Sequence, residues 1–155
     1  MKLYIGCDPT GINHKKEIIL LLNALGHEVI DIPIKEGFED YPDIAKEVCL
    51  NVLKNKYSKG ILICGTGMGM CLAANKIKNI RATLCVDVYC ADKSRSSNDS
   101  NILTLGALTQ DVESVKTIVK VWVQDNPLNA NSARKLAKIM AFEKENIGSE
   151  YNDEQ

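Results

Sequence analysis

Apolar runs typical of buried strands alternate along the chain with segments whose apolar residues recur at helical spacing. The pattern predicts strands at Lys2–Asp8, His27–Ile32, Lys59–Cys64, Arg81–Val86 and Asn101–Gly106. It predicts helices at Asn13–Ala24, Pro42–Lys56, Met68–Ile77, Tyr89–Arg95, Asp111–Val123 and Ala130–Lys144. Near-continuous apolar strands that alternate with helices are typical of a parallel sheet covered on both faces. We therefore predict an α/β fold.

Ligands of such sheets bind beyond the carboxyl ends of the strands, where the strand order switches. This rule directs attention to the segments that we place after the predicted strands. They are Asp8–Gly11, Cys64–Gly69, Asp87 and the loop Ser94–Asn101.

Composition narrows the class of protein. The 155 residues are 45% hydrophobic and 25% charged, with a net charge of -1, which predicts one globular domain without a basic surface for nucleic acid or an anionic membrane. No apolar run approaches the roughly 20 residues of a membrane span, and the N-terminus lacks the apolar segment of a signal peptide. We expect a cytoplasmic protein with one domain over 1–147 and a polar tail over 148–155.

The six cysteines indicate reduced thiols, because the chain is too long and too rich in apolar residues to be a small disulfide scaffold. There is no CxxC pair, and His14 and His27 are not spaced as metal ligands. We therefore expect no metal site, and most cysteines should be small buried apolar residues.

Cys64 ends an apolar run and is followed by glycines at Gly65, Gly67 and Gly69 before a predicted helix. Such glycines free the backbone to turn sharply and to expose amide N–H groups, which together with a helix N-terminus favour an anion. The anion could be a phosphate, a carboxylate, charge that appears only during a reaction, or the Cys64 thiolate itself, which a helix N-terminus stabilises. A tight turn without chemistry is the alternative.

Three known phosphate and thiol motifs do not fit this loop. A Walker sequence is absent, and a dinucleotide fingerprint would follow the first strand. A cysteine phosphatase would need an arginine six residues after the thiol, where Met70 stands.

Other polar residues fall near the same loop. Asp8 follows the first strand directly and could cap the next helix or contact a ligand. Thr66 lies inside the glycine loop, where a threonine commonly binds only the local backbone. We expect Met68 and Met70 to pack beneath the helix.

Six short motifs occur together in a familiar order. They are GCD at Gly6–Asp8, DYP at Asp40–Pro42, ICGTGMG at Ile63–Gly69, AANK at Ala73–Lys76, SR at Ser94–Arg95 and ND..N at Asn98–Asn101. To about Ile139, the chain resembles the sugar-phosphate isomerase family that includes ribose-5-phosphate isomerase B and the galactose-6-phosphate isomerase subunits.

The resemblance implies a Rossmann-like three-layer αβα sandwich with a five-stranded parallel sheet. It implies a homodimer or tetramer with shared active sites, in which the last helix packs on a partner subunit. It also implies an aldose–ketose isomerase without metal, nucleotide or other cofactor, acting in carbohydrate metabolism such as the pentose phosphate pathway.

The same resemblance assigns roles to individual residues. Cys64 matches the base that moves a proton between C1 and C2, and Asp8 and Thr66 match residues that contact the sugar. Asn98, which we place on the same edge as Cys64, helps the loop to hold the enediolate oxygens. The substrate-binding set is completed by Gly65, Gly67, Met68, Gly69, Lys135 and Arg134.

The chain departs from the family at four positions where charged or proton-donating side chains are usual. Pro9 and Ser97 replace histidines, and Leu108 and Asn131 replace arginines. Lys135, Arg134 or Arg95 could supply the positive charge for a phosphate, and an arginine's fork geometry would be lost with lysine.

Four interpretations therefore stay open. The chain could be a self-sufficient isomerase, with ribose 5-phosphate favoured as its substrate, or an isomerase of another phosphorylated sugar. It could be the cysteine-bearing subunit of a hetero-oligomeric galactose-6-phosphate isomerase, paired with a paralogous subunit. It could also be a non-catalytic sugar-phosphate binding subunit, although binding alone does not require a thiol at position 64.

Overall fold

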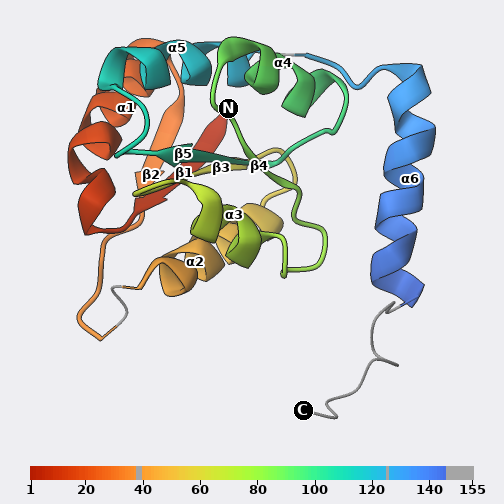
Figure 1. Ribbon diagram of the computed structural model, residues 1–155, viewed down its shortest axis with the longest axis horizontal. Coiled ribbons are helices and arrows are strands. Elements are labelled where there is room, and N and C mark those ends of the chain that lie inside the picture. The colour runs from red at the N-terminus through yellow and green to blue at the C-terminus, as the bar shows by residue number, and fades with distance from the viewer. Residues whose placement is uncertain (38–39, 125, 146–155) are drawn as a thin grey trace.

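Five parallel strands form one sheet between two layers of helices in the computed structural model (Figure 1). The structure describes residues 1–37, 40–124 and 126–145. The strands are β1 (Lys2–Cys7), β2 (Glu28–Asp31), β3 (Lys59–Cys64), β4 (Ala82–Leu84) and β5 (Ile102–Gly106). The helices are α1 (Ile12–Ala24), α2 (Tyr41–Leu53), α3 (Met68–Ala74), α4 (Val88–Ser96), α5 (Val112–Trp122) and α6 (Ala130–Glu145), with a short 3₁₀ helix, η1 (Pro9–Gly11), before α1.

The strand order is β2-β1-β3-β5-β4, and each neighbouring pair is parallel. Cys7 pairs with Ile63 and Cys64 pairs with Gly106, so the carboxyl ends of β1, β3 and β5 meet at one edge. The predicted parallel α/β sandwich is confirmed.

The sheet separates two apolar cores. One core joins the sheet to α1, α4 and α5 and contains Ile61 and Ile63. The other joins it to α2 and α3 and contains Leu62 and Cys64. Figure 1 shows the same two layers on opposite sides of the strands. The alternation along β3 directs the Cys64 side chain towards the layer of α2 and α3.

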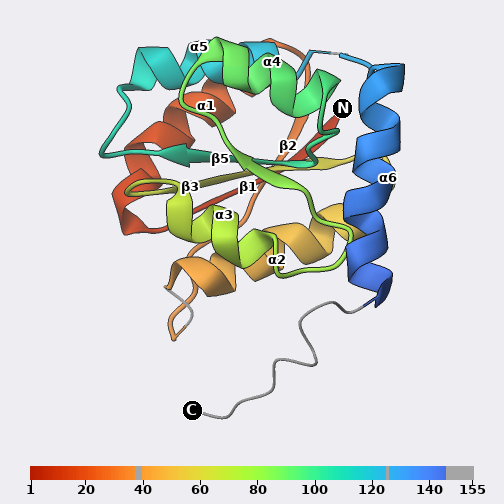
Figure 2. The same cartoon turned by 45° about the vertical axis from the view of Figure 1, so that its right-hand side comes forward.

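Helix α6 stands beside the sandwich rather than in either layer (Figures 1 and 2). The segment before it is anchored by Asn129, whose backbone N–H and side-chain Nδ2 both donate to the carbonyl oxygen of Ser96 at the end of α4. Ile139 and Phe142 on α6 are 49% and 55% exposed, which is a large apolar exposure for one helix. The polar tail predicted over 148–155 lies outside the described residues.

The main boundary differences fall around α3 and β4. Helix α3 ends at Ala74 instead of Ile77, because the chain turns at Asn75 to reach the sheet. Strand β4 keeps only Ala82–Leu84 of the predicted Arg81–Val86, since it pairs with β5 alone at the edge of the sheet. Among the described helices, none combines the length and the apolar character needed to cross a membrane.

Candidate active site

Cys64 lies at the carboxyl end of β3, where the chain turns towards α3. Its side chain is 5% exposed in the single chain, so the sulfur sits under the loop rather than on the surface. The backbone N–H of Gly67 donates to Sγ over 3.2 Å. The glycine loop therefore turns at least one amide donor towards the thiol, an arrangement that favours negative charge on sulfur.

The glycines of this loop are required by its close packing. Gly67 has a φ of +77°, and a Cβ there would lie 2.6 Å from Leu84 Cδ1 and 2.9 Å from the backbone carbon of Leu105. A Cβ on Gly69 would lie 2.8 Å from the ring of Tyr41. Larger residues would displace the loop from the strand ends, so the glycines set where the amides lie.

Asp8 joins Cys64 at the same edge. Its backbone N–H donates to the carbonyl oxygen of Ile63, the residue before Cys64, over 3.1 Å. Its carboxylate accepts hydrogen bonds from Thr10, at 2.9 Å from N and 2.5 Å from Oγ1. Asp8 therefore caps η1, which is one of the two roles predicted for it. Its partly exposed carboxylate lies at the edge of the sheet that carries Cys64.

Thr66 is exposed on the glycine loop, and its Oγ1 accepts the N–H of Met68 over 3.4 Å. The hydroxyl therefore has the local backbone role expected of a turn threonine, and it faces the solvent side of the loop. Met68 is 58% exposed, so the expectation that it packs beneath the helix is wrong. Met70 is fully buried, as expected.

Asn98 does not lie at the edge of Cys64. It follows α4 and precedes β5, whose register pairs Ile102 with Gly60 and Gly106 with Cys64. The loop Ser94–Asn101 consequently lies at the amino ends of the strands, and the prediction that it shares the edge of Cys64 is wrong. Each crossover helix returns the chain to the amino edge before the next strand begins.

Asn98 instead lines a cavity of about 520 Å³ between β4 and α6, together with Leu136, Ile139 and Phe142. Arg134 and Lys135 are exposed near the start of α6, the end that is anchored to Ser96. In one chain, these three predicted site residues are therefore not brought together with Cys64, Asp8 and Thr66.

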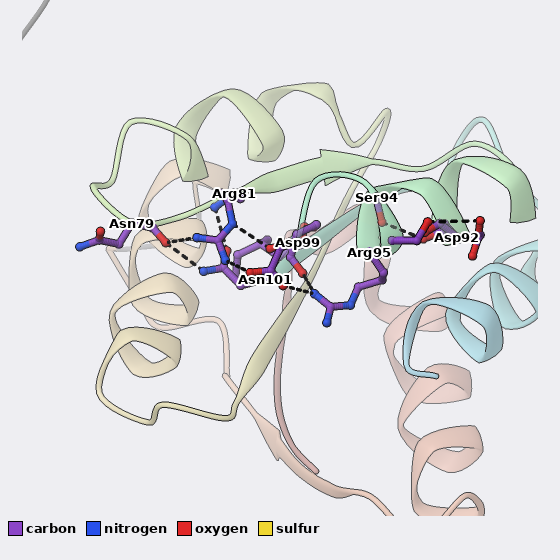
Figure 3. Close-up of polar contacts among 11 residues, drawn as sticks. Asn79, Arg81, Asp92, Ser94, Arg95, Asp99 and Asn101 are labelled. Carbon is purple, nitrogen blue, oxygen red and sulfur yellow. Dashed lines mark hydrogen bonds and ion pairs between the residues drawn. The ribbon is translucent and has the colours of Figure 1, made fainter. Parts of the chain in front are cut away.

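The turn after Asn98 is held by two arginines (Figure 3). Asp99 has a φ of +46°, and its carboxylate accepts from Arg81 Nη2 over 2.8 Å and from Arg95 Nη1 over 3.3 Å. Arg81 Nε also donates to the Asp99 carbonyl, and Arg95 Nη1 donates to the carbonyl of Ser100. Arg95 is 8% exposed and engaged in this turn, which argues against its predicted alternative role as a phosphate ligand.

Three of the other thiols are structural. All six cysteines are free, and Cys7, Cys49 and Cys85 are fully buried. Burial raises the pKa of Cys7 to about 11 and the pKa values of Cys49 and Cys85 to about 12, so these thiols stay protonated near neutral pH. Among the described residues, there is no group of histidine, cysteine and acidic side chains that could hold a metal ion.

Two contacts at the site were not predicted. Gln110 joins the ends of two strands, because its Oε1 accepts from the N–H of Gly106 over 2.9 Å and its Nε2 donates to the carbonyl of Cys85 over 3.1 Å. The ring of Tyr41 covers Gly69. Tyr41 lies in the DYP motif, which was a usable signal, whereas nothing in the pattern around Gln110 distinguishes it from an ordinary loop residue.

Comparison with known proteins gives consistent matches over nearly the whole chain. The model of a family described as Ribose/Galactose Isomerase matches residues 3–139. A Listeria innocua protein named Ribose-5-P isomerase B is 37% identical over 147 residues, which are 94% of this chain and 99% of the relative. A Pectobacterium atrosepticum protein named D-erythrulose-4-phosphate isomerase is 36% identical over 92% of this chain and 95% of its own length.

A solved structure shares the fold closely. The ribose-5-phosphate isomerase B of Mycoplasma genitalium, with bound ribulose-5-phosphate, has a TM-score of 0.87 and 35% identity over 93% of this chain and 97% of its own.

Proposed function

The chain belongs to the ribose/galactose isomerase family and is a sugar phosphate isomerase. From that premise, we propose that it interconverts ribose 5-phosphate and ribulose 5-phosphate with Cys64 as the base. Several relatives over 90% of the chain carry a ribose-5-phosphate isomerase B name, which supports the pentose substrate. The relative named for D-erythrulose 4-phosphate makes a four-carbon sugar phosphate the second candidate. We place the enzyme in the cytoplasm, where such phosphorylated metabolites are used.

The observation that carries the mechanism is the hydrogen bond from the Gly67 N–H to Cys64 Sγ. In the open-chain aldose, the Cys64 thiolate takes the proton from C2, and the electron pair moves towards the C1 carbonyl oxygen. The resulting cis-enediolate is protonated at C1 by the thiol just formed, with transfer of the O2 proton to O1, which gives the ketose and restores the thiolate. Amide donors at the charge that develops can lower the barrier by several kcal/mol.

The loop contributes the donors for this charge. The first amides of α3 have no intrahelical acceptor. The Gly67 N–H already donates to Cys64 Sγ and the Met68 N–H to Thr66 Oγ1, so in this proposal the N–H groups of Gly65 and Gly69 bind the substrate. Asp8, one strand away, binds a sugar hydroxyl, and the exposed Thr66 contacts the ring.

A second subunit completes the site in this proposal. In their own chain, Asn98, Arg134 and Lys135 lie at the edge of the sheet opposite Cys64. They therefore reach a catalytic thiol only if that thiol belongs to another copy. Apolar exposure supports such an assembly, because Met68 and Leu72 on α3 and Phe142 on α6 are each more than half exposed. The pairing of α6 with the α3 region of a partner would cover these side chains and exclude water from Cys64.

Lys135 and Arg134 of the partner then carry the positive charge for the phosphate. Pro9, Leu108 and Asn131 are uncharged, so they cannot replace it. A third candidate is the cysteine-bearing subunit of a hetero-oligomeric galactose-6-phosphate isomerase, since a paralogous chain could supply the missing charges. A non-catalytic binding subunit is the fourth.

Isomerase assays on the purified chain with ribose 5-phosphate, erythrulose 4-phosphate and galactose 6-phosphate test the proposal. Wild type should interconvert ribose 5-phosphate and ribulose 5-phosphate. Cys64→Ala should have a kcat lower by at least about 10³-fold while it still binds the sugar phosphate. Activity that appears only after addition of a paralogous subunit would favour the hetero-oligomer. Full activity of Cys64→Ala would exclude Cys64 as the base, and no activity on any sugar phosphate would favour a binding subunit.

Mixing two inactive variants tests whether the site is shared. If each site takes Cys64 from one subunit and Asn98 from the other, equal amounts of Cys64→Ala and Asn98→Ala should recover about a quarter of the wild-type activity after exchange. Half of the dimers are then mixed, and each mixed dimer has one intact site. No recovery, with exchange verified by mass spectrometry, would contradict a shared site.

A further inference from the structure

Asn75, in the AANK motif, has no part in the chemistry above, yet its side chain makes an unusual set of contacts. It lies just after α3, and its amide pairs with both backbone groups of Ala82 on the edge strand β4. Nδ2 donates to the Ala82 carbonyl and the Ala82 N–H donates to Oδ1, both over 2.9 Å. A planar amide that gives and takes one hydrogen bond reproduces the pairing of a neighbouring strand.

The same side chain is linked to Cys64 through α3. Nδ2 also donates to the carbonyl of Cys71 over 3.1 Å. The N–H of Cys71 donates to the carbonyl of Gly67 over 3.1 Å, and the N–H of Gly67 donates to Cys64 Sγ over 3.2 Å. A continuous series of hydrogen bonds therefore runs from the edge strand, through one asparagine and one helical turn, to the sulfur.

Packing alone fixes α3 less firmly. The helix has seven residues, of which only Met70 and Ala74 are buried. Met70 and Ala74 pack against the core of α2 and the sheet, with Ala73 at its edge, but apolar contacts are not directional and do little to fix the position of so short a helix along its own axis. The pair of hydrogen bonds to Ala82 is directional and supplies that constraint, because β4 is itself paired with β5.

We propose that Asn75 is a positioning residue that sets the Gly67 amide against the Cys64 sulfur by fixing α3 to the edge of the sheet. The inference rests on the proposed function in one respect, namely that Cys64 is the catalytic base. A misplacement of a reacting group by about 1 Å can cost on the order of 100-fold in rate. Loss of the Asn75 amide should therefore act on the chemical step more than on substrate binding.

The experiment compares Asn75→Ala with Asn101→Ala. Asn101 is a matched control, because its side chain also makes two hydrogen bonds to the segment between α3 and β4, accepting from the N–H of Arg81 over 2.8 Å and donating to the carbonyl of Asn79 over 2.9 Å (Figure 3). It projects from the start of β5 rather than from α3.

Asn75→Ala should lower kcat by about 10- to 100-fold with KM within about 3-fold of wild type. Asn101→Ala should lower the melting temperature by about as much as Asn75→Ala does, because each variant loses a pair of hydrogen bonds to the same segment. It should nevertheless keep kcat within about 3-fold of wild type. Asn75→Asp keeps the acceptor for the Ala82 N–H but loses every bond that Nδ2 donates, so it should also lower kcat. It serves as the test if the alanine variant does not fold. Unchanged kcat in both Asn75 variants, or equal losses in Asn101→Ala, would overturn the proposal.

A second measurement does not depend on the substrate. The rate of Cys64 alkylation by iodoacetamide at one fixed pH is followed by peptide mass spectrometry. The rate should fall in Asn75→Ala and stay unchanged in Asn101→Ala, because only the former displaces the amide that donates to Sγ. If wild type isomerises no sugar phosphate, the proposed function fails while this rate still decides the role of Asn75. An unchanged or raised rate in Asn75→Ala would reject that role.

Discussion

Gly67 combines three requirements at one residue. Its φ of +77° places it in the left-handed region, its N–H donates to Cys64 Sγ and its carbonyl accepts the first helical hydrogen bond from Cys71. The φ value alone would admit asparagine at some cost, but the backbone of Leu105 leaves no room for a Cβ. Loop shape and the electrostatics of the thiol therefore depend on the same backbone atoms.

Gly67→Ala should destabilise the protein by about 3 kcal/mol, from left-handed strain together with the clash against Leu105. Gly26→Ala is the control, because Gly26 has a φ of +79° and a Cβ there would meet nothing within 4 Å. That variant should cost only about 1 kcal/mol. Chemical denaturation measures both, and equal costs would show that packing at Gly67 contributes nothing.

Residue by residue, the sequence placed Cys64, Asp8 and the glycine loop at the ends of apolar strands, and the structure brings them to one edge of the sheet. It could not reveal how far the sulfur is covered, which depends on the packing of α2 and α3 beneath the loop. Met68 and Met70 look alike in the sequence, and only the rotation of a short helix decides that the first is exposed and the second buried.

The helices α4 and α5 both begin at an aspartate cap. Asp87 accepts the N–H of Cys90, and Asp111 accepts the hydroxyl and the N–H of Ser114. These hydrogen bonds lower the pKa of each carboxyl group. Because the folded-state pKa is lowered, the ionised cap stabilises the helix fully above the unfolded-state pKa of 3.8. This stabilisation is lost as the pH falls through the folded-state pKa. Acid should therefore weaken both helix starts.

Asp87→Asn keeps a capping oxygen but removes the titrating group, so its melting temperature should fall less than that of wild type between pH 5 and pH 3. Asp87→Ala should be less stable than wild type at pH 7, because the cap itself is lost. Thermal unfolding monitored by circular dichroism gives both values. An identical acid response in wild type and Asp87→Asn would contradict a contribution from this carboxylate.

At the level of elements, hydrophobic periodicity located every described strand and α-helix, with errors of a few residues at their ends, but it missed η1. The error that mattered for the site came from connection rather than from element type. Asn98 was assigned to the edge of Cys64, although the helix after β4 must carry the chain back before β5 can begin. The position of β4 outside β5 was not readable from the sequence, since it depends on which strand edges fit best in three dimensions.

Across the whole molecule, both apolar cores contain buried thiols that titrate only in the unfolded chain near pH 9. Burial raises the pKa of Cys49 to about 12 in the core of α2 and that of Cys85 to about 12 in the opposite core. A raised pKa means that the folded state retains protons that the unfolded state releases. The stabilisation is complete below pH 9 and is lost as the pH rises towards the folded values.

Wild type should lose more stability than Cys49→Ala between pH 8 and pH 10.5, by about 2 kcal/mol. The alanine variant is expected to be weaker at both pH values because of the smaller side chain, so the comparison concerns the change with pH. Urea denaturation at each pH measures this change. Equal losses in the two proteins would show that the Cys49 thiol is not responsible.

The strand order also dictates a sequence of events during synthesis. β4 leaves the ribosome before β5, yet β5 is the strand that pairs with both β3 and β4. In a nascent chain that ends before Ile102, β4 therefore has no strand to pair with, and β3 is paired on one side only. The side chain of Asn75, which pairs with Ala82 on β4, cannot reach its final position until β5 has paired between β3 and β4. The thiol loop therefore cannot reach its final form until the last strand of the sheet has been translated.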